Sequence, residues 1–257
     1  MSGQGRIAAV TGAGGGIGRA LCERLAGHDW KVVAADRDAE KLKWAGGVAG
    51  VAAVEADITT EAGNALVVRT ALDRFGGLDA VVLNAAIPMS GMIEETSMDA
   101  FDQVLSVNLK GPVLGIRAVL PALRARGGGA ILVTSSTHGL AGDTGFWAYS
   151  ASKHGLIGVV KSVARDVGWE KIRINAICPG STRATGMSTP LEAELPTMFA
   201  GIAASIPLQR WGEPDEMAAV MEFLISPEAS YVHGATIVVD GGALAGSGLL
   251  GPARGQG

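Results

Sequence analysis

The sequence contains few cysteines, and their spacing excludes two common ways of stabilising a small fold. Only two of the 257 residues are cysteines. Cys22 and Cys178 lie far apart and form no C-x-x-C pair, so they match neither a disulfide framework nor a zinc site. A chain of this length needs neither, because it can bury a large apolar core. We expect both thiols to be buried in a reducing compartment.

Charge is also scarce, and this limits the partners of the protein. Charged residues make up 18% of the chain, with 21 Lys and Arg against 25 Asp and Glu, which gives a formal net charge of −4. Because no basic block is present, binding to nucleic acid or to an anionic membrane is not expected. The four histidines are scattered, so the sequence predicts no metal site.

No segment has the composition of a signal peptide or a membrane span. No apolar run precedes the strand-like segment that begins near Ile7. The longest uncharged stretch, 127–142, is too short and too rich in Ser, Thr and His to cross a bilayer. We therefore expect a soluble cytoplasmic protein.

Apolar residues, 48% of the chain, form short runs that alternate with segments of helical length. Val- and Ile-rich runs without polar alternation are typical of parallel strands that helices cover on both faces. The pattern predicts an α/β fold, a doubly wound parallel sheet of seven strands. No linker or repeat divides the chain, so we expect a single domain over 1–257. The predicted strands are 6–11, 31–36, 51–56, 78–84, 130–135, 173–178 and 236–239.

Two segments stand apart from this alternation. The segment 184–211 separates the sixth strand from the last helix and holds only short helical patterns. Open α/β folds often carry a mobile substrate lid at such a place, and we predict one here. The Gly-rich segment 245–257 is expected to be flexible or to dock on a partner subunit.

A glycine-rich turn connects the first predicted strand to a helix. Residues 11–19 are Thr-Gly-Ala-Gly-Gly-Gly-Ile-Gly-Arg, a T-G-x-x-x-G-I-G pattern. Glycines at such a turn let a pyrophosphate approach the backbone, where helix amides and the helix dipole stabilise its charge. The alternative is a turn with only a structural role. The position between strand and helix favours the nucleotide.

An acidic residue ends the second predicted strand. Asp36 lies 18 residues after Gly18, near the place where dinucleotide folds put the carboxylate that binds the adenosine ribose. A carboxylate accepts a hydrogen bond from the ribose 2′-OH and repels a 2′-phosphate, which predicts NAD as the cofactor. The alternatives are a solvated charge at a strand end, or a phosphate bound by Arg37 if Asp36 turns away.

One of the two tyrosines lies in a pattern that supports acid–base chemistry. Tyr149 and Lys153 occupy positions i and i+4 of a predicted helix and therefore share one face. An ammonium group beside a phenol favours the phenolate and lowers the pKa of the phenol toward neutral pH. Ser136 ends the fifth strand, where its hydroxyl is placed to hold a substrate oxygen. The alternative for each motif alone is a surface pair beside a Ser-rich turn.

Together and in this order, the motifs resemble those of the short-chain dehydrogenase/reductase family, over about residues 5–244. The resemblance is carried by the turn at 11–18, Asn84-Ala85-Ala86 after the fourth strand, Asn108 in a helix, Ser136, Tyr149-x-x-x-Lys153, and Pro179-Gly180 after the sixth strand. It implies a single-domain Rossmann-like oxidoreductase, a dimer or tetramer, that moves a hydride between NAD(H) or NADP(H) and an alcohol or ketone.

The resemblance also implies a role for each matching residue. Tyr149 would be the catalytic acid/base, Ser136 would orient the carbonyl, and Lys153 would lower the pKa of Tyr149 and bind the nicotinamide ribose. Asn108 would hold a water that relays protons outward from Lys153. The resemblance implies further cofactor-binding residues: Gly12, Gly16, Ile17 and Gly18 at the pyrophosphate, Asp57 at the adenine edge, Asn84 and Ala85 at the ribose, and Pro179, Gly180 and Thr182 at the nicotinamide. Ile58, next to Asp57, is also expected to bind the cofactor.

The sequence departs from the family pattern at two places. The usual Asn-Asn-Ala-Gly after the fourth strand is Asn84-Ala85-Ala86 preceded by Leu83. Ala184 stands where a Thr is often found, which leaves Thr182 or Thr185 to contact the carboxamide. The Tyr–Lys spacing also differs from that of the enoyl reductases of the same superfamily, which place the two residues further apart.

Two other function classes share a glycine-rich first turn. One is a catalytically silent dinucleotide-binding sensor or scaffold, and the intact set of four candidate catalytic residues argues against it. The other is a methyltransferase that uses S-adenosylmethionine, which has no use for Ser136, Tyr149 and Lys153.

The segments expected around the nicotinamide are mostly apolar. His138, Phe146, Trp147 and Met187 are predicted to line the substrate pocket, with a simple turn residue as the alternative for His138. Such a pocket favours a neutral, medium-sized or cyclic secondary alcohol or ketone. Arg183 is expected at the surface. If it points inward, it would pair with a carboxylated cyclic dihydrodiol, a substrate class that the run 179–182 also resembles.

Two long helices are expected to serve assembly. The segments 98–123 and 147–167 carry apolar residues on more than one face. Together with the resemblance, this predicts a homotetramer, or failing that a dimer.

Overall fold

Within the described residues, seven parallel strands form a sheet in the order β3-β2-β1-β4-β5-β6-β7. The computed structural model describes residues 5–186 and 188–246. All seven predicted strands are confirmed, with boundaries that differ by at most two residues. The strands are β1 (Ile7–Thr11), β2 (Lys31–Asp36), β3 (Val51–Glu55), β4 (Ala80–Leu83), β5 (Gly129–Thr134), β6 (Ile172–Pro179) and β7 (Thr236–Val239).

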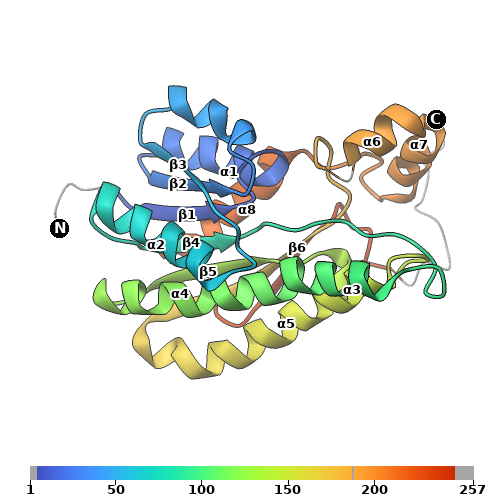
Figure 1. Cartoon of the computed structure of the whole chain (residues 1–257). Coiled ribbons are helices and arrows are strands. Elements are labelled where there is room, and N and C mark those ends of the chain that lie inside the picture. Colours follow the sequence, from blue (N-terminus) through green and yellow to red (C-terminus); the bar gives the residue numbers. More distant parts are fainter. Residues whose placement is uncertain (1–4, 187, 247–257) are drawn as a thin grey trace.

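Helices cover both faces of this sheet. Figure 1 shows α1 and α8 on one face, α2, α4 and α5 on the other, and the short pair α6 and α7 set apart from both layers. In the described part of the chain the α-helices are α1 (Gly16–Gly27), α2 (Glu61–Phe75), α3 (Met98–Leu105), α4 (Gly111–Ala125), α5 (Trp147–Val167), α6 (Ser188–Glu194), α7 (Pro196–Ser205) and α8 (Pro214–Ile225).

Alternate residues of each strand enter two separate apolar clusters. Ile7 and Ala9 of β1 pack into the cluster that includes α2, α4 and α5. Ala8 and Val10 pack into the cluster that includes α1 and α8. All four side chains are fully buried or nearly so, because successive residues of a strand point to opposite faces. The predicted doubly wound architecture is confirmed.

The strand order reverses between β1 and β4, and this positions the site. The chain leaves β1 toward β2 on one side and continues from β4 toward β5 on the other. Ligands of open α/β sheets bind at such a switch point, outside the carboxyl ends of the strands. Thr11, the last residue of β1, joins the two strands here. Its Oγ1 accepts hydrogen bonds from the backbone N–H groups of Asn84 (3.0 Å) and Ala85 (3.2 Å).

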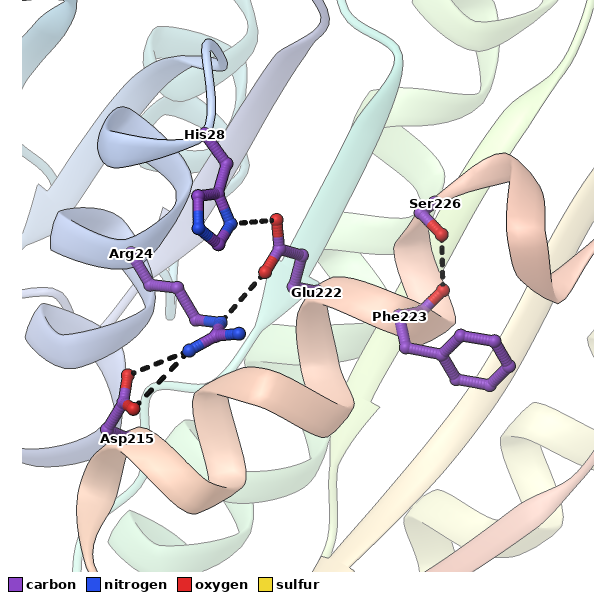
Figure 2. Close-up of polar contacts among 6 residues, drawn as sticks. All are labelled: Arg24, His28, Asp215, Glu222, Phe223 and Ser226. Carbon is purple, nitrogen blue, oxygen red and sulfur yellow. Dashed lines mark hydrogen bonds and ion pairs between the residues drawn. The ribbon is translucent and has the colours of Figure 1, made fainter.

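A cluster of ion pairs connects α1 to α8 (Figure 2). Arg24 Nε donates to Glu222 at 2.8 Å, and its guanidinium also lies 3.3 Å from Asp215. His28 Nδ1 lies 2.7 Å from the other oxygen of Glu222. Partly exposed pairs of this kind contribute little free energy, so apolar packing must stabilise the helix pair and the ion pairs fix its register.

One helical stretch has the length and composition of a membrane span. It is Met98–Ala125, which comprises α3, a π-helical turn (Ser106–Lys110) and α4. Buried core helices often share these properties. Here α4 packs against α2 and α3 packs against α5, and Val104, Ile116 and Val119 are buried.

The tight contact between α1 and the turn after β1 gives a stability prediction. A Cβ at Gly18 would lie 2.2 Å from the carbonyl oxygen of Gly12, so Gly18→Ala must push the helix away from the turn. Such overpacking lowers the free energy of unfolding by about 1–3 kcal/mol. Denaturant unfolding measures the change. The matched control is Gly27→Ala at the end of the same helix, where a Cβ meets nothing within 4 Å. A loss of stability no larger than that of the control would contradict the prediction.

Candidate active site

The glycine-rich turn lies at the entrance of the crevice and fits a pyrophosphate. Gly12 and Gly16 have positive φ angles of 68° and 51°, which L-residues rarely adopt. No side chain caps the start of α1 at Gly15, and a Cβ there would meet open space. The first N–H groups of the helix therefore face a position that an anion can occupy. The Ile17 side chain packs against the core cluster of α1 and α8, and its N–H group is one of these first amides of the helix. Its role at the pyrophosphate stays a prediction.

Asp36 is held over this turn and does not point away from it. Its Oδ2 accepts a hydrogen bond from Gly14 N at 3.0 Å, and its Oδ1 accepts one from Asp38 N at 3.1 Å. Arg37 is exposed. The carboxylate thus faces the side of the crevice where an adenosine ribose lies when its pyrophosphate is on the turn.

Asp57 and Ile58 follow β3 at the same edge of the sheet. Asp57 Oδ1 accepts bonds from the N–H group (2.9 Å) and the hydroxyl (2.7 Å) of Thr59, which lower the pKa of Asp57. Ile58 is buried. The turn that presents both residues is fixed by Thr60, whose Oγ1 donates to Asp57 O at 2.9 Å.

The first turn and the end of β4 are in direct contact. A Cβ at Gly12 would lie 2.8 Å from Ala85 Cα, and Asn84 Nδ2 donates to Thr11 O at 3.2 Å. Asn84 and Ala85, expected at the ribose, therefore adjoin the expected pyrophosphate site. The structure brings the two halves of the predicted cofactor site together.

Ser136, Tyr149 and Lys153 converge beneath the end of β5. Their exposed fractions are 8%, 7% and 1%. Lys153 Nζ donates to the carbonyl oxygen of Thr134 at 2.9 Å and lies 5.4 Å from the centroid of the Tyr149 ring. Ser135 Oγ donates to Lys153 O at 2.9 Å, which fixes the first turns of α5 against the strand. The interpretation as a surface pair is therefore wrong.

Burial, rather than attraction between the two groups, dominates the electrostatics of this cluster. Desolvation raises the pKa of Tyr149 to about 12, opposed by hydrogen bonding with Ser136. Desolvation also lowers the pKa of Lys153 to about 8. With the groups that the chain itself supplies, desolvation determines the direction of both shifts, because removing both groups from water disfavours both charges. The lowering of the Tyr149 pKa by Lys153 stays a prediction for the site with its cofactor.

Asn108 lies in the π-helical turn between α3 and α4, not in a regular α-helix. Its Oδ1 accepts from Ile87 N at 2.8 Å and its Nδ2 donates to Ile87 O at 2.9 Å. The side chain is fully buried, and Nδ2 also lies 3.4 Å from Ser152 Oγ on α5. Asn108 thus joins the segment after β4 to the helix that carries Tyr149. The water-relay role stays a prediction.

Comparisons with known proteins agree with this arrangement. The profile of the family described as "Enoyl-(Acyl carrier protein) reductase" matches residues 12–243. Levodione reductase of Leifsonia aquatica is 34% identical over 249 residues, which cover 92% of this chain and 93% of that protein. The crystal structure of levodione reductase superposes with a TM-score of 0.87, at 33% identity over 93% of this chain and 98% of that one.

Two further relatives have similar coverage. The trans-4-hydroxycyclohexanecarboxylate dehydrogenase of Sinomonas cyclohexanicum is 36% identical over 255 residues, 95% of each chain. The crystal structure of 3-ketoacyl-(acyl-carrier-protein) reductase from Brucella melitensis complexed with NADH has a TM-score of 0.86, at 33% identity over 94% of this chain and 99% of that one.

The chain belongs to the short-chain dehydrogenase/reductase family. It is therefore an oxidoreductase that acts on an alcohol or ketone with an NAD(P) dinucleotide. The fold predicted from the sequence is the Rossmann-like fold of this family. The prediction that the chain is not an enoyl reductase, although the matching profile is described by that name, still rests on the three residues between Tyr149 and Lys153.

The residues after β6 that match the family pattern lead directly into the segment 184–211. Gly180 lies against Asp240, where a Cβ would be 2.7 Å from the Asp240 Cβ. Thr182 Oγ1 donates to Gly180 O at 3.0 Å, and Thr185 Oγ1 lies 3.0 Å from Ser188 Oγ. A Cβ at Gly16 would lie 3.3 Å from Ala184 O, so the start of the segment 184–211 lies against the glycine-rich turn.

The aromatic residues predicted for the substrate pocket separate into two groups. The His138 ring lies 4.9 Å from Phe146 and 5.6 Å from Tyr149, so these two side chains adjoin the candidate acid/base. The Trp147 ring instead stacks on Phe101 of α3 at 5.1 Å. The stacking assigns Trp147 a packing role between α3 and α5, and its place in the substrate pocket stays a prediction. Met187 lies outside the described residues.

Sequence reasoning missed two side chains of this site. Ser135 anchors α5 through its bond to Lys153 O, and Asp143 lies 3.1 Å from His138 Nε2. Both had a signal. Ser135 directly precedes Ser136 at the strand end, and Asp143 is the one acid between Ser136 and Tyr149.

The buried ammonium predicts a pH-dependent cost to stability. In the unfolded chain Lys153 stays charged up to its ordinary pKa of 10.5, whereas burial in the folded protein lowers that pKa to about 8. Below pH 8 the folded protein must hold a charged, desolvated group. Between these two pKa values the unfolded state binds more protons, so stability rises with pH.

Lys153→Met should therefore raise the free energy of unfolding at pH 7 by about 2 kcal/mol, after the lost bond to Thr134 O is subtracted. Unfolding is compared at a series of pH values, with exposed Lys161→Met on the same helix as control. The gain should disappear as pH rises from 8 toward 10.5. A gain that is independent of pH, or equal to the control, would contradict the burial account.

Proposed function

We propose that the protein is an NAD-dependent alcohol dehydrogenase or ketone reductase. The observation that carries the proposal is the convergence of Ser136, Tyr149 and Lys153 beneath the end of β5, with the glycine-rich turn and Asp36 at the same crevice. The direct test is absorbance at the reduced-nicotinamide band with a panel of secondary alcohols and ketones. No turnover with any of them would favour the second class, a silent dinucleotide-binding sensor or scaffold.

Each residue has a distinct part in the reaction. Tyr149 gives or takes the proton on the substrate oxygen, and Ser136 donates a hydrogen bond to that oxygen. Lys153 binds the nicotinamide ribose and stabilises the phenolate. A bound oxidised nicotinamide supplies the hydride acceptor and a positive charge beside the phenol. Burial raises the pKa of Tyr149 to about 12, so positive charge beside the phenol, from Lys153 and from a bound oxidised nicotinamide, would be needed to make the phenolate accessible near neutral pH.

We propose NAD rather than NADP as the cofactor. Asp36 accepts two backbone hydrogen bonds and cannot easily turn away from the ribose position. A fixed carboxylate repels a 2′-phosphate in a partly desolvated site. Gly12, Gly16, Gly18, Asp57, Asn84, Pro179 and Thr182 are assigned to the remainder of the dinucleotide.

The substrate that we favour is a neutral, medium-sized or cyclic secondary alcohol or ketone. Arg183 is engaged by acidic side chains, since it pairs with Glu192 and lies 3.6 Å from Glu213. A guanidinium with these partners is less available to a substrate carboxylate. The carboxylated ring stays the second candidate, because one relative is named for such a substrate. Oxidation of either alcohol would place the enzyme in EC class 1.1.1, and oxidation of a cyclic dihydrodiol would place it in EC class 1.3.1.

We further propose a single-domain, cytoplasmic protein that binds neither nucleic acid nor membranes, with 184–211 as its substrate lid. Cys22 and Cys178 are buried free thiols, which is typical of proteins in a reducing compartment. In the segment 184–211, Phe199 of α7 stacks on Trp211 at 4.2 Å, and Trp211 Nε1 donates to Phe199 O at 2.9 Å. These contacts hold α7 against Trp211, the residue at the C-terminal end of this segment.

We propose that α4 and α5 present the main face for assembly into a homotetramer. A groove between them combines half-buried aliphatic residues with charges of both signs, which suits the self-complementary contact of a two-fold axis. It is lined by Val113, Arg117, Leu120, Val159, Val163 and Asp166.

The proton-transfer role of the phenol predicts the effect of Tyr149→Phe. Turnover should fall below about one per cent of wild type, because no other group reaches the substrate oxygen with a labile proton of suitable pKa. NADH affinity, measured by fluorescence, should stay nearly unchanged. The control is Tyr231→Phe, which removes the other, fully exposed tyrosine. Substantial turnover by Tyr149→Phe would refute the assignment.

The cofactor proposal predicts that NAD exceeds NADP in kcat/KM by about tenfold or more. Asp36→Asn keeps an oxygen for the bond from Gly14 N and removes the charge, so the preference should narrow. The control is Asp38→Asn, which changes a neighbouring carboxylate and should leave the preference for NAD unchanged. Steady-state kinetics with both cofactors measure the ratio. A wild type that prefers NADPH would direct attention to Arg37.

The assembly proposal predicts a mass in solution well above the 26.1 kDa of one chain. Leu120→Glu should shift the mass measured by light scattering toward the monomer, because it places a charge in the apolar part of the groove. Leu72→Glu, on an exposed position of α2, is the control. A wild type that is monomeric at micromolar concentration would refute the proposal.

A further inference from the structure

The helical pair α6–α7 has little apolar packing of its own. None of the residues of α7 is buried, and Ser188 is the one buried residue of α6. The two helices pack against each other, and no other helix or strand contacts either of them as extensively. A unit with so few buried contacts opens easily. Contacts at the ends of the pair therefore decide where it lies.

The first turn of α8 holds an arginine from each end of the segment 184–211. The Arg183 guanidinium lies 3.6 Å from Glu213, the N-cap residue of α8. At the other end, Arg210 donates to both carboxylate oxygens of Glu216, each at 2.7 Å. Glu216 Oε2 also accepts a hydrogen bond from Glu213 N at 2.8 Å, so the two acids belong to one rigid turn.

Arg183 also reaches from this turn into the helical pair itself. Its guanidinium donates to Glu192 of α6, and its Cζ lies 6.0 Å from the centroid of the Phe199 ring of α7. One side chain thus contacts α6, α7 and the start of α8. An isolated exposed ion pair contributes little free energy, but a charge that several elements share restricts all of them.

The backbone around Arg183 is fixed on one side and strained on the other. Arg183 N donates to Gly212 O, and Gly212 N donates to Ser181 O, both at 2.9 Å. The next residue, Ala184, has a φ of 52°, and Gln209 near the other end of the segment has a φ of 56°. L-residues rarely adopt such angles, and surrounding contacts must hold them there.

These contacts connect the helical pair to the elements of the cofactor site. The helix α8 packs closely on α1, which begins at the glycine-rich turn. The start of the segment 184–211 lies against the same turn, at Gly16. Figure 1 shows α6 and α7 set apart from the helical layers, so Arg183 contacts them where they leave the body of the protein.

We propose that Arg183 is a positioning residue that anchors α6 and α7 beside the substrate. The proposal rests on the proposed alcohol dehydrogenase function, with 184–211 as the substrate lid. Leu195 and Met198 are more than half exposed, so this part of the lid has apolar side chains free to contact a substrate. Arg183 acts through the lid and does not touch the reacting atoms. It therefore affects substrate binding more than the chemical step.

Amide hydrogen exchange tests the anchoring without turnover. Arg183→Ala and Glu192→Ala should each raise the exchange rate of the amides of 188–205 by about threefold or more, since contacts of this kind contribute on that scale. The double variant should exchange no faster than Arg183→Ala, because both changes break one contact. Lys43→Ala, which removes another exposed ion pair, with Glu40, is the control. No increase in either variant, or additive increases, would overturn the proposal.

Steady-state kinetics give a readout that a purely structural role would not produce. Arg183→Ala should raise the KM of the alcohol or ketone by about threefold or more, while kcat and NADH affinity stay within about twofold of wild type. Arg183→Lys keeps a cation for Glu192, so its KM should lie nearer to that of wild type. An unchanged KM in Arg183→Ala, a loss confined to kcat, or an equal KM in Arg183→Lys and Arg183→Ala would overturn the positioning role.

A matched pair of substrates separates anchoring from direct binding of a substrate by Arg183. The pair is a cyclic ketone that carries a carboxylate and the methyl ester of the same ketone. Anchoring predicts that Arg183→Ala raises KM by the same factor for both, whereas a rise confined to the carboxylate would overturn it. If wild type turns over no alcohol or ketone, the proposed function fails, and the exchange rates of 188–205 decide separately whether Arg183 anchors the helical pair.

Discussion

The structure depends on one constraint, the burial of an amine and a phenol together under the end of a parallel strand. Lys153 is 1% exposed and its ammonium has a single backbone acceptor, Thr134 O. An isolated buried charge costs several kcal/mol, so this position is tolerated only where β5 and α5 are held in one register. Ser135 supplies that register by bonding Lys153 O, and the apolar clusters on both faces of the sheet keep it.

The same constraint connects the fold to the chemistry. Both buried groups prefer to be neutral, and their pKa values shift for that reason, to about 12 for Tyr149 and about 8 for Lys153. At neutral pH Lys153 still carries its charge, but a phenol with a pKa of about 12 supplies little phenolate from the pair alone. A dinucleotide bound in the crevice between β1 and β4 would supply a further positive charge. We regard this dependence of Tyr149 on the cofactor as the central claim of the account.

The sequence predicts the fold and the members of the site well, because both depend on local signals. Apolar runs give the seven strands, and glycine spacing gives the turn at Gly12 and Gly18. The sequence does not predict features that depend on tertiary contacts. The direction of the Tyr149 pKa shift follows from desolvation by distant segments. The stacking of Trp147 on Phe101, and the engagement of Arg183 by Glu192, depend on how separate helices pack.

Titration of the phenol by its ultraviolet absorbance tests the central claim most directly. The chain has only two tyrosines, so subtracting the titration of Tyr149→Phe from that of wild type isolates Tyr149. The account predicts a pKa of about 12 for Tyr149 in the protein alone and a clearly lower pKa with saturating NAD. A Tyr149 pKa that is already near neutral without NAD, or that does not change when NAD binds, would contradict it.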